Sequence, residues 1–296
     1  MKLLDGKQLS QTIKEEIAKE VDLLLSNHEK VPHLAAVLVG GDPASETYVG
    51  HKVKACEATG FKSTLVKCKA NISEDELLSK IHELNENDDI DGFIVQLPLP
   101  DHININKITM AISPNKDVDG FHPENFGKMA IGMPAYLPAT PNGIMMLLER
   151  NNVETEGKHC VVVGRSNIVG TPMSILLSRN SKPGNCTVTI CHSRTKNLAS
   201  ITRMADILIV AIGKLEFITA DMVKEGAVVV DVGMHRVEDS AKKLGFRLTG
   251  DVAFEEVAPK CSYITPVPGG VGPMTIVSLL SNTLKAAQQN THKLQP

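Results

Sequence analysis

The chain has 296 residues, of which 42% are hydrophobic and 22% charged, values typical of an ordinary globular protein. This length favours about two domains, each large enough to bury its own core. Lys and Arg total 31 against 34 Asp and Glu, so no net positive charge favours nucleic acid as a partner. A small molecule is the expected partner.

No segment has the composition of a membrane anchor. The longest apolar run, Ile207 to Ile212, is too short to cross a bilayer, and MKLLDGKQLS carries too short an apolar run for a signal peptide. The cysteines show no CxxC pair, which argues against both a zinc site and a disulfide framework. We therefore expect no metal, reduced thiols, no contact with a membrane, and a cytoplasmic location.

The first half of the chain alternates between helical and extended patterns. The expected elements are a helix over 7–26, a strand over 34–39, a helix over 44–58, a strand over 61–68, a helix through Leu84 and, in the stretch 92–100, a strand broken by two prolines. Ser73 and Glu76 form a capping box for the third helix. This order predicts a parallel sheet covered by helices on both faces.

Between Pro114 and Pro141 the periodicity is lost, so we expect a linker there. Alternation then resumes. The expected elements are a helix over 142–150, strands over 161–163, 187–191, 206–211 and 227–232, a helix over 196–204 and a last helix from Pro273 to about Gln289. The strand-dense second half is typical of a nucleotide-binding domain.

The stretch VVVGRSNIVGTP, residues 161–172, reads as a buried strand, a glycine turn and a helix start. Gly164 ends the strand, and Pro172 lies in the first turn of the helix, where its missing N–H costs nothing. Such a helix start suits a phosphate group. The spacing is not GxGxxG, however, and a tight turn without a ligand explains this stretch alone equally well.

The second strand of this half, Thr187 to Cys191, is followed by His192, Ser193 and Arg194, with no acidic residue. NAD-binding domains usually place Asp or Glu at this point to bind the ribose 2′-hydroxyl, whereas a nearby Arg accommodates the 2′-phosphate of NADP. Together with Arg165, these donors favour NADP over NAD. The alternative is that they are ordinary surface residues.

Three stretches of the first half carry candidate catalytic side chains. Tyr48 and Lys52 lie one helical turn apart on one face, although a solvated lysine is the commoner explanation of that pattern. Gln96 ends a strand where ligands bind in open parallel sheets. In KDVDG, Asp117 and Asp119 could bind a cation, although no EF-hand spacing follows. One carboxylate of this pair could instead accept two hydrogen bonds from a heterocycle with an amidine-like edge, although a plain turn is more common.

Taken together, these motifs resemble the bifunctional 5,10-methylenetetrahydrofolate dehydrogenase/cyclohydrolase family. The matching pieces follow the family's order and span nearly the whole chain: ASETYVGHK, VQLPLP, KDVDG, GRSNIVGTP, CHSRT and TPVPGGVGPMT. The resemblance implies an α/β homodimer of two domains, an α/β/α substrate domain and a Rossmann-like NADP-binding domain, which flank a cleft for the folate. The substrate domain is expected over residues 1–140, with the helix 273–296 packing back onto it. The NADP-binding domain is expected over residues 141–272.

The resemblance also implies a role for each matching residue. Lys52 is similar to the family's catalytic lysine and Gln96 to its hydrogen-bonding partner, while Tyr48 matches the tyrosine that stacks on the folate and Asp119 the carboxylate that anchors the pterin. The remaining folate contacts are expected at Leu97, Pro98, Pro268, Gly269, Gly270 and Pro273. The cofactor contacts are expected at Gly164, Arg165, Ser166, Ile168, His192, Ser193, Arg194, Val232 and Gly233.

The implied reaction is oxidation of 5,10-methylenetetrahydrofolate with NADP+, followed by hydrolysis of the methenyl product to 10-formyltetrahydrofolate. Three other functions fit parts of the pattern. They are a dehydrogenase of this family without hydrolysis that uses NAD, an amino-acid or shikimate-type dehydrogenase, and a nucleotide-binding module without turnover.

Overall fold

The computed structural model describes residues 1–242 and 245–293, which divide into two compact units. The six-stranded unit comprises residues 1–10 and 140–275, and the three-stranded unit comprises 11–139 and 276–296. Residues 1–10, expected in the first domain, instead fall in the six-stranded unit because strand β1 (Lys2–Leu3) pairs with strand β11 (Tyr263–Ile264).

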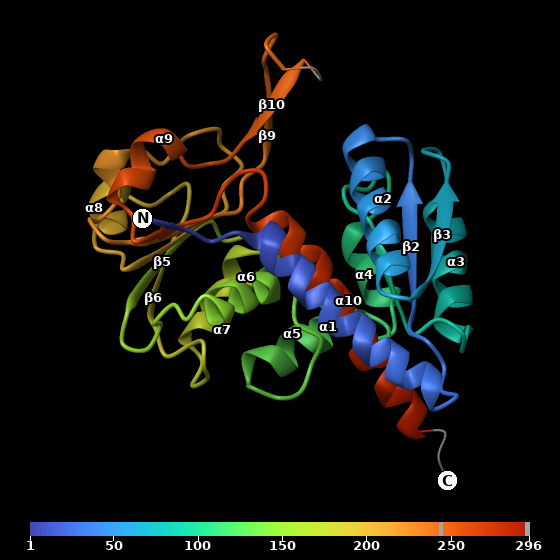
Figure 1. Ribbon diagram of the computed structural model, residues 1–296. Helices are drawn as coiled ribbons and strands as arrows, with labels where there is room; N and C mark the ends of the chain where they lie inside the picture. The colour runs from blue at the N-terminus through green and yellow to red at the C-terminus, as the bar shows by residue number, and fades with distance from the viewer. Residues whose placement is uncertain (243–244, 294–296) are drawn as a thin grey trace. The chain divides into compact units, whose positions relative to one another are not determined.

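The three-stranded unit is a parallel sheet in the order β3-β2-β4 with helices around it (Figure 1). Its elements are β2 (His33–Val39), α2 (Pro43–Ala58), β3 (Lys62–Cys68), α3 (Glu74–Glu86), β4 (Gly92–Val95), α4 (Ile105–Ala111) and α5 (Pro123–Ala130), with most of α1 (Gly6–Ser26) and α10 (Val271–Lys293). Every residue of β2 and β4 is buried, as the apolar runs predict for the inner strands of such a sheet. The core packs Phe93 of β4 against Leu77 and Ile81 of α3.

Strand β4 ends at Val95, one residue before the expected end at Gln96 and ahead of Pro98 and Pro100, which have no N–H to donate to a ladder. The expectation of a linker between Pro114 and Pro141 was wrong, because residues 114–139 belong to the unit. This segment contains α5, and Asp117 forms an isolated β-bridge with Phe93.

Polar side chains hold helix α10 to the segment 114–139 of this unit. Asn282 donates to the carbonyl oxygens of Val118 and Leu137 at 2.8 and 2.9 Å. Farther along, Gln288 reaches Glu20 of α1, and the two helices lie side by side within this unit (Figure 1). The helix continues to Lys293, a few residues past the end that we expected at about Gln289.

The six-stranded unit is a parallel sheet in the order β1-β11-β8-β7-β5-β6. Its elements are β5 (His159–Val163), β6 (Thr187–Cys191), β7 (Ile207–Val210), β8 (Val228–Asp231) and the helices α6 (Ala139–Arg150), α7 (Gly170–Ser178), α8 (Leu198–Thr202) and α9 (Phe254–Val257). The chain runs outward from β5 to β6 and then returns to β7 on the other side of β5. The strand order therefore reverses between β5 and β7, which is where doubly wound sheets bind dinucleotides.

An antiparallel hairpin of β9 (His235–Glu238) and β10 (Phe246–Thr249) follows β8. The sequence analysis missed it, since both strands are short and rich in charge. The predicted fold class, two α/β domains with parallel sheets and helices, is confirmed.

Candidate active site

Tyr48, Lys52 and Gln96 come together in the three-stranded unit. Helix α2 is fixed at its start by Asp42, whose side chain accepts from the backbone N–H of Ser45 at 2.8 Å. Farther along this helix, the Lys52 Nζ lies 4.8 Å from the centre of the ring of Tyr48, which precedes it by one turn. The same Nζ donates to Gln96 Oε1 at 3.1 Å, and Gln96 directly follows β4.

Lys52 is 5% exposed, so the commoner explanation of a solvated lysine is wrong here. Burial lowers the pKa of Lys52, because the ammonium form loses its hydration, while the charge of Asp119 acts in the opposite direction. A lysine in this setting reaches its neutral form at lower pH than a surface lysine does. Lys52 is therefore better suited than a surface lysine to accept a proton in its neutral form and to return it as the ammonium.

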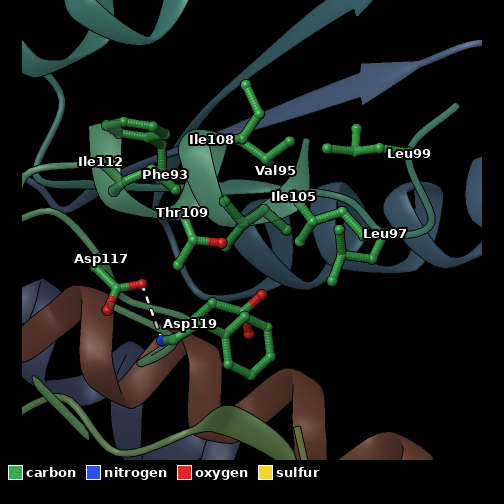
Figure 2. A pocket seen from close by; sticks show the side chains of 12 residues that line it. Phe93, Val95, Leu97, Leu99, Ile105, Ile108, Thr109, Ile112, Asp117 and Asp119 are labelled. Atoms are coloured by element: carbon green, nitrogen blue, oxygen red, sulfur yellow. Dashed lines mark hydrogen bonds between the residues drawn. The ribbon is translucent and has the colours of Figure 1, made fainter. Parts of the chain in front are cut away.

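Asp119 lies two residues after Asp117, which forms the β-bridge with Phe93 of β4. Asp119 lines a small pocket (Figure 2). Burial raises the pKa of Asp119, and the charge of Lys52 opposes that shift. The pocket is a cavity of about 20 Å³, room for about one water, lined chiefly by apolar residues of β4 and α4, with Leu97 at the edge. Asp119 is thus a carboxylate at the rim of a largely apolar site.

The turn that carries Asp119 is fixed by Asp117, which is 1% exposed. The Asp117 carboxylate accepts from the backbone N–H groups of Phe121 and His122 at 3.2 and 2.8 Å and from Asn125 Nδ2 at 2.9 Å; Figure 2 marks the bond from Phe121. Burial raises the pKa of Asp117 to about 6, against these hydrogen bonds. From the sequence, Asp117 was considered only as one of two aspartates that could bind a cation or a heterocycle, and no local signal predicted that it holds this turn.

The predicted cofactor turn lies at the carboxyl end of β5. Gly164 has φ +128°, and a Cβ there would lie 2.2 Å from the carbonyl oxygen of Ala211, so this position requires glycine. The Ser166 hydroxyl accepts from the N–H of Val169 at 3.1 Å, at the start of α7. Arg165, Ser166 and Ile168 are exposed on this turn.

The other predicted cofactor residues follow the neighbouring strand, because β5 and β6 pair in register with Val163 opposite Cys191. The His192 Nδ1 accepts from the N–H of Arg194 at 3.1 Å, which holds the turn and leaves Ser193 and Arg194 exposed. The described turn presents hydroxyl and guanidinium donors and no carboxylate after β6. This donor set fits a 2′-phosphate.

The remaining predicted residues lie elsewhere in the six-stranded unit. Val232 and Gly233 directly follow β8, and the Val232 N–H donates to the Val210 carbonyl at 2.9 Å. Pro268, Gly269 and Gly270 form the turn between β11 and α10, and Pro273 lies in the first turn of α10. Their role toward a folate stays a prediction, as does that of Pro98, an exposed residue after β4.

The described part of the chain holds neither a cluster of metal ligands nor a membrane-spanning helix. Residues 1–242 and 245–293 contain no group of three or more His, Cys, Asp or Glu side chains placed to hold a metal ion. Over the same residues, no helix is both long and apolar enough to span a membrane.

Comparison with known proteins places these features in one family. The profile of the tetrahydrofolate dehydrogenase/cyclohydrolase catalytic domain matches residues 4–119, and that of the NAD(P)-binding domain matches residues 138–291. The chain belongs to this family. The identification based on the sequence motifs is therefore confirmed, and the amino-acid or shikimate-type dehydrogenase is excluded.

Individual relatives match along their full length. The bifunctional protein FolD of Cytophaga hutchinsonii is 67% identical over 287 residues, covering 97% of this chain and 99% of the relative. The bifunctional FolD structure from Campylobacter jejuni has a TM-score of 0.91 at 50% identity, covering 98% and 99% of the two chains. The Trypanosoma brucei enzyme, solved with NADP and an inhibitor, has a TM-score of 0.91 at 38% identity, covering 97% of each chain.

Proposed function

We propose that this chain oxidises 5,10-methylenetetrahydrofolate with NADP+ and hydrolyses the resulting 5,10-methenyltetrahydrofolate to 10-formyltetrahydrofolate. The observation that carries this proposal is the buried Lys52, bonded to Gln96 and electrostatically coupled to Asp119, in a chain of this family. A dehydrogenase without hydrolysis has no need for a desolvated lysine with a lowered pKa.

The oxidation requires chiefly that the folate be held in position. Tyr48 offers a ring for stacking, and Asp119 offers two carboxylate oxygens to the N–H donors of the pterin. The lone pair of the neighbouring folate nitrogen stabilises the methenyl cation that remains when hydride leaves. NADP+ supplies the hydride acceptor.

NADP fits the residues at the carboxyl ends of β5 and β6. Arg165, Ser193 and Arg194 would hold the 2′-phosphate, while Ser166 and the start of α7 suit the pyrophosphate. We assign the contacts of Gly164, Ile168, His192, Val232 and Gly233 to the same cofactor on the strength of the family motif. NADP is preferred over NAD because the site offers cations instead of a carboxylate.

The hydrolysis is assigned to Lys52. The neutral amine accepts a proton as water adds to the methenyl carbon, and the ammonium then returns a proton to the folate nitrogen whose bond to that carbon breaks. The formyl group stays on the other nitrogen, and one proton is released overall. Gln96 holds the Lys52 amine through its Oε1 atom, which fixes the direction of the transfer.

We propose a homodimer, as the family resemblance implies, to be measured as molar mass by light scattering. A cytoplasmic location is consistent with the six cysteines, which are all free and buried in the described structure.

The proposed function is tested by mixing the purified protein with 5,10-methylenetetrahydrofolate and either NADP+ or NAD+. We expect reduced NADP to form together with 10-formyltetrahydrofolate, and NAD+ to be the poorer substrate. Reduced cofactor with persistent methenyl product would instead indicate a dehydrogenase alone. No reduction of either cofactor would favour a binding module without turnover.

A further inference from the structure

A second group of buried acidic residues lies in the six-stranded unit and is not used by the mechanism above. Asp251 is 0% exposed, and its Oδ2 accepts from the backbone N–H groups of Ile212 and Gly213 at 2.8 and 2.9 Å. Its Oδ1 accepts from the N–H of Lys214 at 2.9 Å and from His235 Nε2 at 2.7 Å. A carboxylate offers about four acceptor positions, and here donors fill all of them.

His235 is the partly exposed member of this group, with 23% of its side chain accessible. It begins the β9–β10 hairpin and pairs with Thr249, two residues before Asp251. The hairpin therefore returns the chain to Asp251 and brings the imidazole onto its carboxylate. Because an ionised carboxylate can only accept, the ring must carry its proton on Nε2.

Asp231 lies beside Asp251 and holds the next loop. Its carboxylate accepts from the N–H groups of Gly233, Asp251 and Val252 at 2.9, 3.0 and 2.9 Å. A Cβ at Gly233 would lie 2.3 Å from Asp251 Oδ1, so that loop closes directly over the carboxylate. The two aspartates thus fix the backbone that follows both β7 and β8.

These loops lie at the point where the strand order reverses. The segment 212–214 follows β7, and the carbonyl of Ala211, just before it, lies 2.2 Å from where a Cβ on Gly164 would stand. The segment 212–214, which Asp251 holds, therefore begins next to the cofactor turn at Gly164 in space, although it follows β7 in the chain. A dinucleotide bound at this reversal crosses from the β6 side toward β7 and β8. On the assignment above, its adenosine half lies against Arg165 and Arg194, which follow β5 and β6, and its nicotinamide half lies against the loops after β7 and β8.

We propose that the Asp251–His235 pair is a positioning device for the nicotinamide half of the dinucleotide, acting through the backbone of residues 212–214 and 232–233. This inference rests on the proposed function, since it takes NADP as the ligand of this edge. Neither side chain is expected to touch the cofactor. Both hold the loops in the conformation that receives it.

The test separates the two halves of the cofactor. The His235→Ala variant loses the side-chain donor to Asp251, whereas His235→Gln keeps an N–H at a similar distance from the backbone. Glu238→Ala, an exposed substitution in the same strand β9, is the matched control. The dissociation constants of NADP+ and of 2′,5′-ADP, which represents the adenosine half, are measured for each full-length protein by calorimetry.

For His235→Ala we expect NADP+ to bind about tenfold more weakly, because binding must then also order the loops 212–214 and 232–233, which the pair no longer holds in place. Binding of 2′,5′-ADP should stay within about twofold, and His235→Gln and Glu238→Ala should resemble the parent. Equal weakening of both ligands would show a general structural role and overturn the proposal, as would unchanged NADP+ binding.

The outcome for the parent separates this inference from the proposed function. A parent that binds 2′,5′-ADP and NADP+ supports the assigned cofactor edge, whatever the variants do. A parent that binds neither overturns the assignment of NADP and this inference with it.

Discussion

Replacing Asp119 by Asn removes one charge from the candidate site while nearly preserving the shape of the side chain. Two effects follow from the structure. The pterin donors lose a charged acceptor, and Lys52 loses the negative charge that opposes the effect of burial on its pKa. The variant is expected to fold, because the burial that raises the pKa of Asp119 disfavours its ionised form.

The magnitude for folate binding follows from the hydrogen bonds that are lost. One hydrogen bond to a charged group contributes roughly 1.5–3 kcal/mol, so a folate analogue should bind Asp119→Asn at least about tenfold more weakly. The pKa of Lys52 should fall further, because burial then acts without an opposing charge. The pH–rate profile of methenyl hydrolysis should therefore move toward lower pH.

The assay is calorimetric titration of a folate analogue, paired with hydrolysis rates across pH. Glu57→Gln removes an exposed carboxylate from α2, the helix that carries Lys52, and is the matched control. We expect this control to resemble the parent in both measurements. Analogue binding by Asp119→Asn that equals the parent would refute the anchoring role of Asp119.

Three further variants test separate parts of the account. Arg165→Ala should weaken NADP+ binding about tenfold or more and leave NAD+ nearly unchanged; equal losses for both cofactors in calorimetry would contradict the 2′-phosphate contact. Asp117 keeps its proton up to about pH 6 when folded but releases it near its ordinary pKa of 3.8 when unfolded, so this group's stabilising contribution is lost as pH rises through that window. Relative to the parent, Asp117→Asn should therefore gain on the order of 3 kcal/mol in unfolding free energy from pH 4 to pH 7, measured by urea denaturation; a constant difference would count against this shift. Ser73→Ala removes the capping box with Glu76 and should cost about 1 kcal/mol of stability without changing either reaction rate.

The sequence predicted the parts of the fold that depend on buried runs and local signals. The apolar strands around Val37 and Val162 and the capping box at Ser73 all lie where the patterns placed them. The β9–β10 hairpin was missed because its strands are short and rich in charge, and helix α5 because it is held by contacts with residues outside the helix. For α5, these include the bond from Asn125 to Asp117, which no periodicity reveals.

The sequence identified which residues belong to the candidate site, but not how they are buried or which contacts they make. The spacing of Tyr48 and Lys52 placed them on one helical face, but nothing local showed that this face is buried against Gln96. Asp251 was missed for the same reason. Its partners, residues 212–214 and His235, come from loops that only the sheet topology brings together.

The central claim is that one buried lysine hydrolyses the product of the oxidation, and Lys52→Met tests it most directly. Methionine fills the same space without a charge, so folding should be preserved. Parent and variant are each mixed with 5,10-methylenetetrahydrofolate and NADP+, and reduced NADP and methenyltetrahydrofolate are followed separately. The parent should form reduced NADP while methenyl product stays low. In the variant, hydrolysis should be about 10²–10⁴-fold slower, so that methenyl product accumulates in step with reduced NADP. Low methenyl product in the variant, at the parent's rate of oxidation, would contradict the account.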